Sequence, residues 1–304
     1  MSLVEQIRQY YFDNFEYLTP SKRFHFASRL AAWEGSVQAK QALVELKPLM
    51  VPKAGASTLK GLFEQPLGPV YADNLRRRYF EQYNLLHGAN NMMFRVRHLK
   101  EIYGIDLSDD LLDIVKLNQL EELGQQLLAD RLAVKWLSSF AVNCLYLLEK
   151  LDGVPLKLNP SWFLDLRNEY ELKDPIQLNL LVYLFTHCII AESNFYAQVI
   201  PASRLSIYIQ MLETLDEVIG KYPGIRLDAK LEYLIASRIC HKHAALEEKI
   251  YRLVEQSVSP KGYIIEKLKS PDNHELNDIN TAEHRNVLYI MSTTAYWPKN
   301  ARVV

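Results

Sequence analysis

The stretch from Asp174 to Pro201, DPIQLNLLVYLFTHCIIAESNFYAQVIP, carries no formal charge between Asp174 and Glu192. A helix that is apolar on nearly every side must be surrounded by protein or by lipid. The uncharged run is too short to cross a bilayer, which takes about 20 apolar residues. It therefore predicts a central core helix over 175–199. Its polar members His187, Glu192 and Asn194 need partners, because an unpaired buried polar group costs about 1–3 kcal/mol.

Helical signals continue along most of the chain. A capping side chain precedes a proline in Thr19-Pro20, Asn159-Pro160 and Asp174-Pro175, and this pairing satisfies one unpaired amide while presetting φ for the first turn. Glycine is sparse at 11 residues, and no Asn-Gly or Asp-Gly turn joins alternating runs. We expect an all-α protein with about ten to twelve helices, arranged as an antiparallel α/α ring (toroid-like) or as an irregular bundle. The expected helices are 2–17, 20–46, 73–87, 89–103, 109–128, 130–150, 160–171, 175–199, 203–221, 228–257 and 281–297.

Breaks between these helices set the expected domain organisation. The segment 47–72 is rich in proline and glycine and predicts a long loop. A second gap, 259–279, contains Gly262-Tyr263-Ile264-Ile265, which predicts a short extended piece. We expect a single helical domain over 1–304, because the most apolar helices need neighbours from both halves. A division into 1–151 and 160–304 is the alternative.

Composition excludes several classes of function. Lys plus Arg (35) nearly balances Asp plus Glu (36), for a net charge of −1, so no global field attracts nucleic acid or an anionic membrane. The three cysteines, Cys144, Cys188 and Cys240, lie in apolar runs, and an odd count without close spacing favours reduced thiols. The N-terminus lacks the apolar core of a secretion signal. We expect a cytoplasmic protein whose partner is a small molecule or another protein.

Ionisable residues recur on three of the later expected helices. His187 and Asn194 share one side of helix 175–199, which also carries Glu192. Glu232 and Arg238 lie on the helix that follows Asp228, and the last helix begins with Glu283, His284, Arg285 and Asn286. A histidine beside carboxylates in a dry cleft suits acid–base catalysis, because burial and neighbouring charges bring pKa values toward the working pH. The predicted catalytic residues are His187, Glu192, Glu232 and His284, and the predicted ligand-binding residues are Asn194, Arg238 and Arg285.

A second interpretation assigns the same residues to structural pairs. Buried histidines and ion pairs of this kind are common in large helical proteins. The chain would then be a helical protein–protein interaction scaffold without catalytic activity, working through segment 47–72 or an exposed groove. The sequence does not decide whether the chain is an enzyme. We favour the small-molecule site because three separate helices supply ionisable residues. No substrate, cofactor or oligomeric state is indicated.

Metal binding is not expected. The pairs His187-Cys188 and Cys240-His241 are adjacent on a helix and point about 100° apart, so neither chelates as a unit. The run Asp109-Asp110-Leu111-Leu112-Asp113 matches the DDxxD motif of class I terpene synthases, which bind Mg²⁺-diphosphate. Here the acids follow Ser108 at an expected helix start, where they complement the helix dipole. A Mg²⁺-dependent enzyme of the terpene-synthase kind is therefore only a third interpretation.

Overall fold

The computed structural model describes residues 1–51, 55–67, 74–265, 278–299 and 302–303, with residues 55–58 and 74 described as backbone only. Within these residues the protein is all-α, with 16 α-helices and no strands. Val258 and Ile264 form an isolated antiparallel bridge, where the sequence predicts a short extended piece. The chain divides into two compact units: unit 1 comprises Met1–Met50 and Ser193–Val303, and unit 2 comprises Val51–Glu192.

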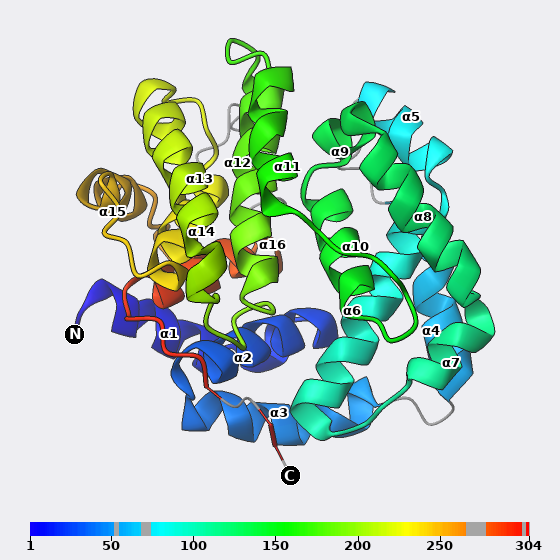
Figure 1. Ribbon diagram of the computed structural model, residues 1–304. Coiled ribbons are helices and arrows are strands. Elements are labelled where there is room, and N and C mark those ends of the chain that lie inside the picture. The colour runs from blue at the N-terminus through cyan, green and yellow to red at the C-terminus, as the bar shows by residue number, and fades with distance from the viewer. Residues whose placement is uncertain (52–54, 68–73, 266–277, 300–301, 304) are drawn as a thin grey trace. The chain divides into compact units, whose positions relative to one another are not determined.

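Unit 1 contains the two ends of the described chain (Figure 1). Its α-helices are α1 (Leu3–Asp13), α2 (Pro20–Glu34), α3 (Val37–Met50), α13 (Ala202–Lys221), α14 (Leu227–Ile239), α15 (Glu247–Glu255) and α16 (Ile279–Ser292). A 3₁₀ turn, η1 (Phe15–Tyr17), joins α1 to α2.

Unit 2 contains the middle of the chain. Its α-helices are α4 (Gly55–Phe63), α5 (Asn74–Gln82), α6 (Leu85–Tyr103), α7 (Ser108–Ile114), α8 (Leu117–Ala129), α9 (Arg131–Leu137), α10 (Ser139–Glu149), α11 (Pro160–Asp165) and α12 (Pro175–Glu192). A 3₁₀ helix, η3 (Leu166–Glu169), follows α11.

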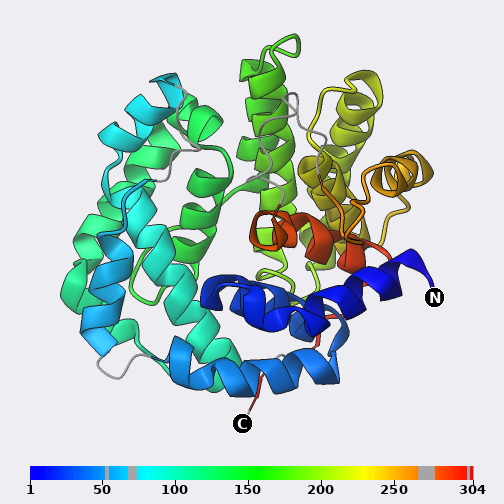
Figure 2. The same ribbon diagram turned by 180° about the vertical axis from the view of Figure 1, so that it is seen from behind.

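The central helix of unit 1 is α16, which packs against α1, α2 and α14. Seen from behind, it runs beside α1 and α2 (Figure 2). Its start is capped by Asp278, whose Oδ1 accepts from the Thr281 amide at 2.7 Å. Asn280 instead bonds outward, accepting from the Thr19 amide at 2.7 Å and donating to the Tyr17 carbonyl at 3.1 Å. These contacts fasten α16 to the start of α2.

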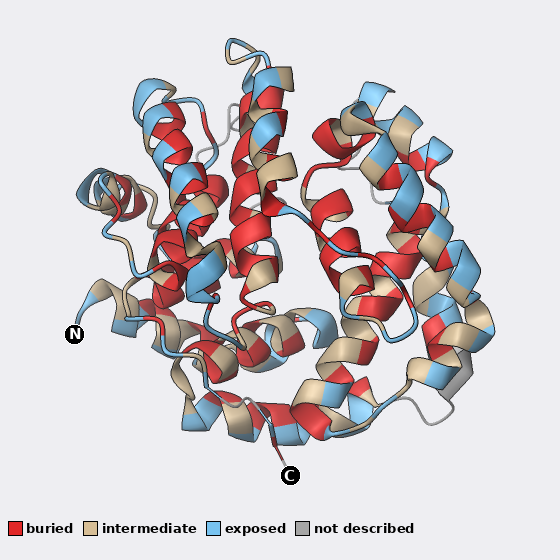
Figure 3. Ribbon diagram, viewed as in Figure 1, coloured by how far each residue is buried: buried red, intermediate tan, exposed pale blue. Residues whose placement is uncertain are grey.

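The core of unit 2 is built on α10 and α12, which pack against each other. Nearly every turn of α12 is buried (Figure 3), as the uncharged run predicts. By length and composition α12 is the one described helix that could cross a membrane, with 67% of it buried inside the protein. The bent pair α9 and α10 passes the same test only if it is counted as one span. A core helix also passes this test, and the burial of α12 matches that interpretation.

Four expected helices are broken in the structure. Helix 109–128 is divided into α7 and α8 at the extended residue Val115. Helix 20–46 is divided at Gly35, whose φ of 69° is the left-handed conformation that ends a helix. Helix 130–150 bends by 111° at Ser138, which has a φ of 49°. Helix 228–257 is interrupted after Ile239, where His241 has a φ of 52°. These four breaks, together with α4, explain why the described helices outnumber the ten to twelve expected.

The expected helix starts, the expected loop and the expected overall arrangement have different outcomes. The three cap–proline starts are confirmed: Thr19, Asn159 and Asp174 each accept a backbone N–H with the side chain. The loop expected over 47–72 is wrong in part, because α3 runs on to Met50 and α4 lies within it; residues 52–54 and 68–72 of that segment lie outside the described chain. The ring or bundle arrangement and the single-domain organisation stay predictions.

Candidate functional site

Four consecutive polar residues near the start of α16 contact three different parts of unit 1. They are Glu283, His284, Arg285 and Asn286, and all but His284 are buried. Successive residues on an α-helix point about 100° apart, so a central helix can reach several packed elements with one short run. Asn286 bonds the backbone of Ile264, accepting from its N–H at 2.8 Å and donating to its carbonyl at 2.9 Å. The other three meet ionisable groups of α2 and α14.

Glu283 lies against α2, and its side chain is 0% exposed. Its Oε1 is 2.7 Å from Nδ1 of His25, and its Oε2 accepts from the Lys22 ammonium at 3.2 Å. Burial alone would raise the pKa of Glu283, but His25 and Lys22 outweigh burial and lower it. The carboxylate is therefore ionised at neutral pH, with a partner for each oxygen.

His25 is held as a neutral imidazole. Burial and the nearby Arg29 charge outweigh the attraction of Glu283 and lower the pKa of His25 to about 4. An ionised carboxylate only accepts hydrogen bonds, so Nδ1 of His25 carries the proton and donates it to Glu283. The lone pair is then on Nε2, for which the described residues supply no hydrogen-bond partner. This nitrogen can accept a proton from another molecule.

The second histidine lies between two carboxylates of α14. Nδ1 of His284 is 3.7 Å from Oδ2 of Asp228, and its Nε2 is 3.7 Å from Oε1 of Glu232. Arg285 holds the other oxygen of Asp228, with its Nε 2.6 Å from Oδ1. Burial would raise the pKa of Asp228, but His284, Arg285 and Arg226 together lower it. The carboxylate thus stays ionised beside the imidazole.

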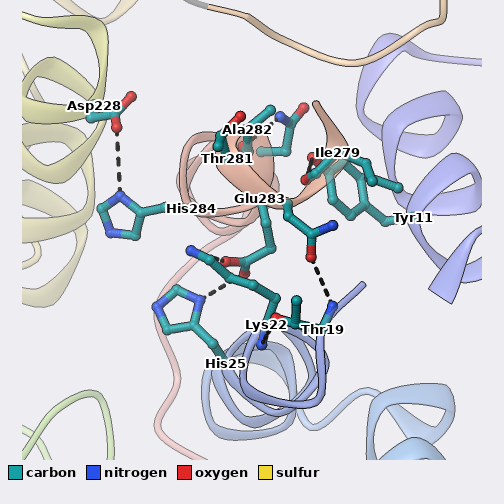
Figure 4. A network of polar contacts seen from close by, with 12 residues as sticks. Tyr11, Thr19, Lys22, His25, Asp228, Ile279, Thr281, Ala282, Glu283 and His284 are labelled. Carbon is teal, nitrogen blue, oxygen red and sulfur yellow. Dashed lines mark hydrogen bonds and ion pairs between the residues drawn. The ribbon is translucent and has the colours of Figure 1, made fainter. Parts of the chain in front are cut away.

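The two imidazoles face the same region of unit 1 (Figure 4). Their ring centroids are 5.6 Å apart and their planes are inclined by 45°. The side chains are 30% exposed at His25 and 27% at His284, whereas that of Glu283 is fully buried. Two solvent-reachable imidazoles backed by buried carboxylates form the group we call the histidine pair site. Such an arrangement can accept, hold and return a proton.

The structure brings together only part of the predicted site. Glu232, His284 and Arg285 lie in the histidine pair site. Arg238 contacts Glu247 and donates from Nε to the Ser292 carbonyl at 3.2 Å, so it links α14, α15 and the end of α16. The stripe expected to carry Asn194 is wrong, because α12 ends at Glu192 and Asn194 lies in a left-handed turn with a φ of 50°.

Two predicted catalytic residues belong to unit 2. His187 is 3.0 Å from Oδ1 of Asn143 through its Nδ1, which links α12 to α10. Glu192 lies near Lys150, which donates to the Ala191 carbonyl at 3.2 Å. Burial and the charge of Arg97 lower the pKa of Lys150 to about 8, against the attraction of Glu192.

Sequence reasoning missed the contribution of α2 and misread Asp228. His25 stands between Phe24 and Phe26 in an otherwise apolar turn, which is a signal that a polar contact lies on that face. Asp228 was named only as the residue before a helix, but it pairs with Arg285. Among the described residues, no group of three or more histidine, cysteine, aspartate or glutamate side chains is placed to hold a metal ion.

Comparison with known proteins adds no family to this description. No protein-family model matches the chain, and neither the curated proteins nor the solved structures that were compared include a match. The candidate site therefore rests on its own geometry.

Proposed function

We propose that the protein binds a small molecule at the histidine pair site and transfers a proton to or from it. The contact between Nδ1 of His25 and the fully buried carboxylate of Glu283, at 2.7 Å, carries this proposal. A buried carboxylate on one ring nitrogen fixes the tautomer and the orientation of an imidazole, so that the other nitrogen can act as a base. His25 is the proton acceptor and Glu283 its positioning residue.

His284 supports this chemistry from the second side. Its ring nitrogens lie 3.7 Å from Asp228 and 3.7 Å from Glu232, so two carboxylates surround it electrostatically. Arg285 keeps Asp228 in place through a 2.6 Å bond. The arrangement resembles neither a metal centre nor a nucleic-acid surface, and the near-neutral composition agrees with a small-molecule partner in a cytoplasmic protein.

Solvent deuterium exchange tests the proposal directly. Small molecules with an acidic C–H bond are first screened for binding by thermal shift, and those that bind are incubated with the protein in D₂O. We expect NMR to show enzyme-dependent deuterium incorporation into at least one of them. His25→Gln should abolish the incorporation and retain binding, because glutamine keeps a hydrogen-bonding group but cannot accept the proton.

A matched variant separates this result from general damage to the protein. His98→Gln changes a half-buried histidine of α6 in unit 2, and it should leave binding and exchange unchanged. Equal exchange in wild type and His25→Gln would refute His25 as the base. Absence of any small molecule that stabilises the wild type would favour the interaction scaffold, in which the same contacts are structural pairs.

A further inference from the structure

Arg29 lies one helical turn beyond His25 on the same face of α2. Residues at i and i+4 on a helix are neighbours, with Cβ atoms about 5–6 Å apart. The charge of Arg29 reaches His25, because it is one of the causes that lower the pKa of that imidazole. Lys22, three residues before His25, contacts Glu283. The unbonded Nε2 of His25 is thus accompanied by one guanidinium that Glu283 does not engage.

Arg29 differs in its hydrogen bonds from Arg8 and Arg285, the arginines of unit 1 that also have a buried nitrogen without an acceptor but bond a carboxylate through another nitrogen. Its Nη1 is buried, and the described chain offers no acceptor to any nitrogen of its guanidinium. Arg8 also has a buried nitrogen without an acceptor, but its other two nitrogens bond Glu34. A buried donor without an acceptor destabilises the fold, and more so when it is charged. Arg29 therefore lies where an acceptor from outside the chain would be strongly favoured.

Tyr196 holds this guanidinium in place. The Arg29 Cζ lies 5.4 Å from the centroid of the Tyr196 ring, within cation–π range. The ring also packs edge-on against Trp33, with centroids 5.9 Å apart. A planar guanidinium laid on an aromatic ring keeps its edge available to a planar anion.

The backbone around Tyr196 is strained. Asn194, Phe195 and Tyr196 have φ angles of 50°, 50° and 77°, and residues other than glycine adopt this left-handed conformation only where the surrounding structure holds them in it. The turn is held by Ser193, whose Oγ accepts from the Tyr196 amide at 3.1 Å and whose carbonyl accepts from the Gln198 amide at 2.8 Å. Strain that persists in a well-bonded turn fixes Tyr196, and hence Arg29, before any ligand arrives.

We infer that the molecule bound at the histidine pair site is a carboxylic acid, anchored by Arg29 through its carboxylate. This inference rests on the proposed function and names its substrate class. A guanidinium fork matches a carboxylate in two parallel bonds. Asp228, Glu232 and Glu283 already contribute negative charge to the site, so a singly charged group is accommodated better than a phosphate dianion.

Acetate is the probe for this anchor. The 8 histidines of the chain are labelled selectively, and the ring resonances of His25 are followed by NMR as sodium acetate replaces sodium chloride at constant ionic strength. We expect a saturable shift and a raised pKa of His25, because the bound anion favours the imidazolium. Arg29→Met should weaken acetate binding at least tenfold, and Arg29→Lys should weaken it less.

Two controls make the result specific. Arg252→Met removes an exposed arginine of α15 that pairs with Glu248 and should leave acetate binding unchanged. In Arg29→Met the pKa of His25 should rise without acetate, because a charge that lowers it is gone, which also shows that the variant is folded around the site.

Three outcomes would overturn the carboxylate anchor: no acetate-dependent shift in the wild type, equal shifts in the wild type and Arg29→Met, or tighter binding of inorganic phosphate than of acetate. The assay involves no turnover. Failure of deuterium exchange together with intact acetate binding would therefore refute His25 as a base and leave the anchor standing, whereas the reverse pattern would refute the anchor alone.

Discussion

The helices α12 and α16 are both buried, but they use polar residues in opposite ways. On α12 a long apolar run carries His187, whose hydrogen bond to Asn143 links two helices of unit 2. On α16 the polar residues are consecutive, and three of them reach charged groups on α2 and α14. The hydrogen bond of His187 joins it to a neutral partner on the neighbouring helix. A consecutive run on a central helix instead collects partners from several elements, so the more polar of the two buried helices is the better place to look for a site.

The largest change in the free energy of unfolding that would test this comparison is expected for Arg285→Met. The change leaves Asp228 largely buried without its 2.6 Å partner, and removing one member of a buried ion pair costs about 3 kcal/mol or more. Urea unfolding of both proteins gives the difference in the free energy of unfolding. The matched control is Arg131→Met, which removes a half-exposed pair with Glu169 and should cost less than about 1 kcal/mol. Equal losses in the two variants would show that the α16 pairs are no stronger than surface pairs.

The sequence predicts the identity of the buried helices better than the contacts between them. The uncharged run identifies α12 as a core helix because burial depends on side-chain composition, which is local. The partnership of Glu283 with His25 joins residues 258 positions apart, and no local pattern encodes it. The prediction that Asn194 lies on the helix was wrong for a related reason. The helical spacing of the sequence continues past Glu192, but the chain enters a left-handed turn that is closed by hydrogen bonds within Ser193–Gln198.

A smaller effect is expected for His25, whose titration makes the stability of the wild type depend on pH; His25→Gln should remove this dependence. The pKa of this histidine is about 4 in the folded protein and about 6.5 in an unfolded chain. Between these values the unfolded state binds a proton that the folded state does not, so stability is complete above the unfolded value and falls as the pH drops toward the folded value. Solvent reaches the ring, which reduces the effect. We expect the free energy of unfolding of the wild type to fall by about 1–2 kcal/mol between about pH 7 and about pH 4.5.

Urea unfolding at these two pH values checks the prediction. The loss should be absent in His25→Gln, because glutamine does not titrate. Staying at or above about pH 4.5 limits the contribution of Glu283, whose lowered pKa removes stability only as the pH falls below the ordinary range of a glutamate. The same loss in both proteins would mean that another group titrates, and that α16 does not hold His25 as a neutral imidazole.

The smallest effect is expected for His187→Ala on α12. The variant loses the hydrogen bond to Asn143 and part of a half-buried ring, and a neutral bond of this kind contributes about 1 kcal/mol. Urea unfolding measures that loss, while the histidine resonances and the deuterium exchange report on the histidine pair site. We expect a stability change of about 1 kcal/mol with no change in the His25 resonances or in exchange, because His187 bonds a neutral side chain within unit 2. Loss of exchange in a stable His187→Ala variant would instead give α12 a part in the chemistry and remove the distinction between the two helices.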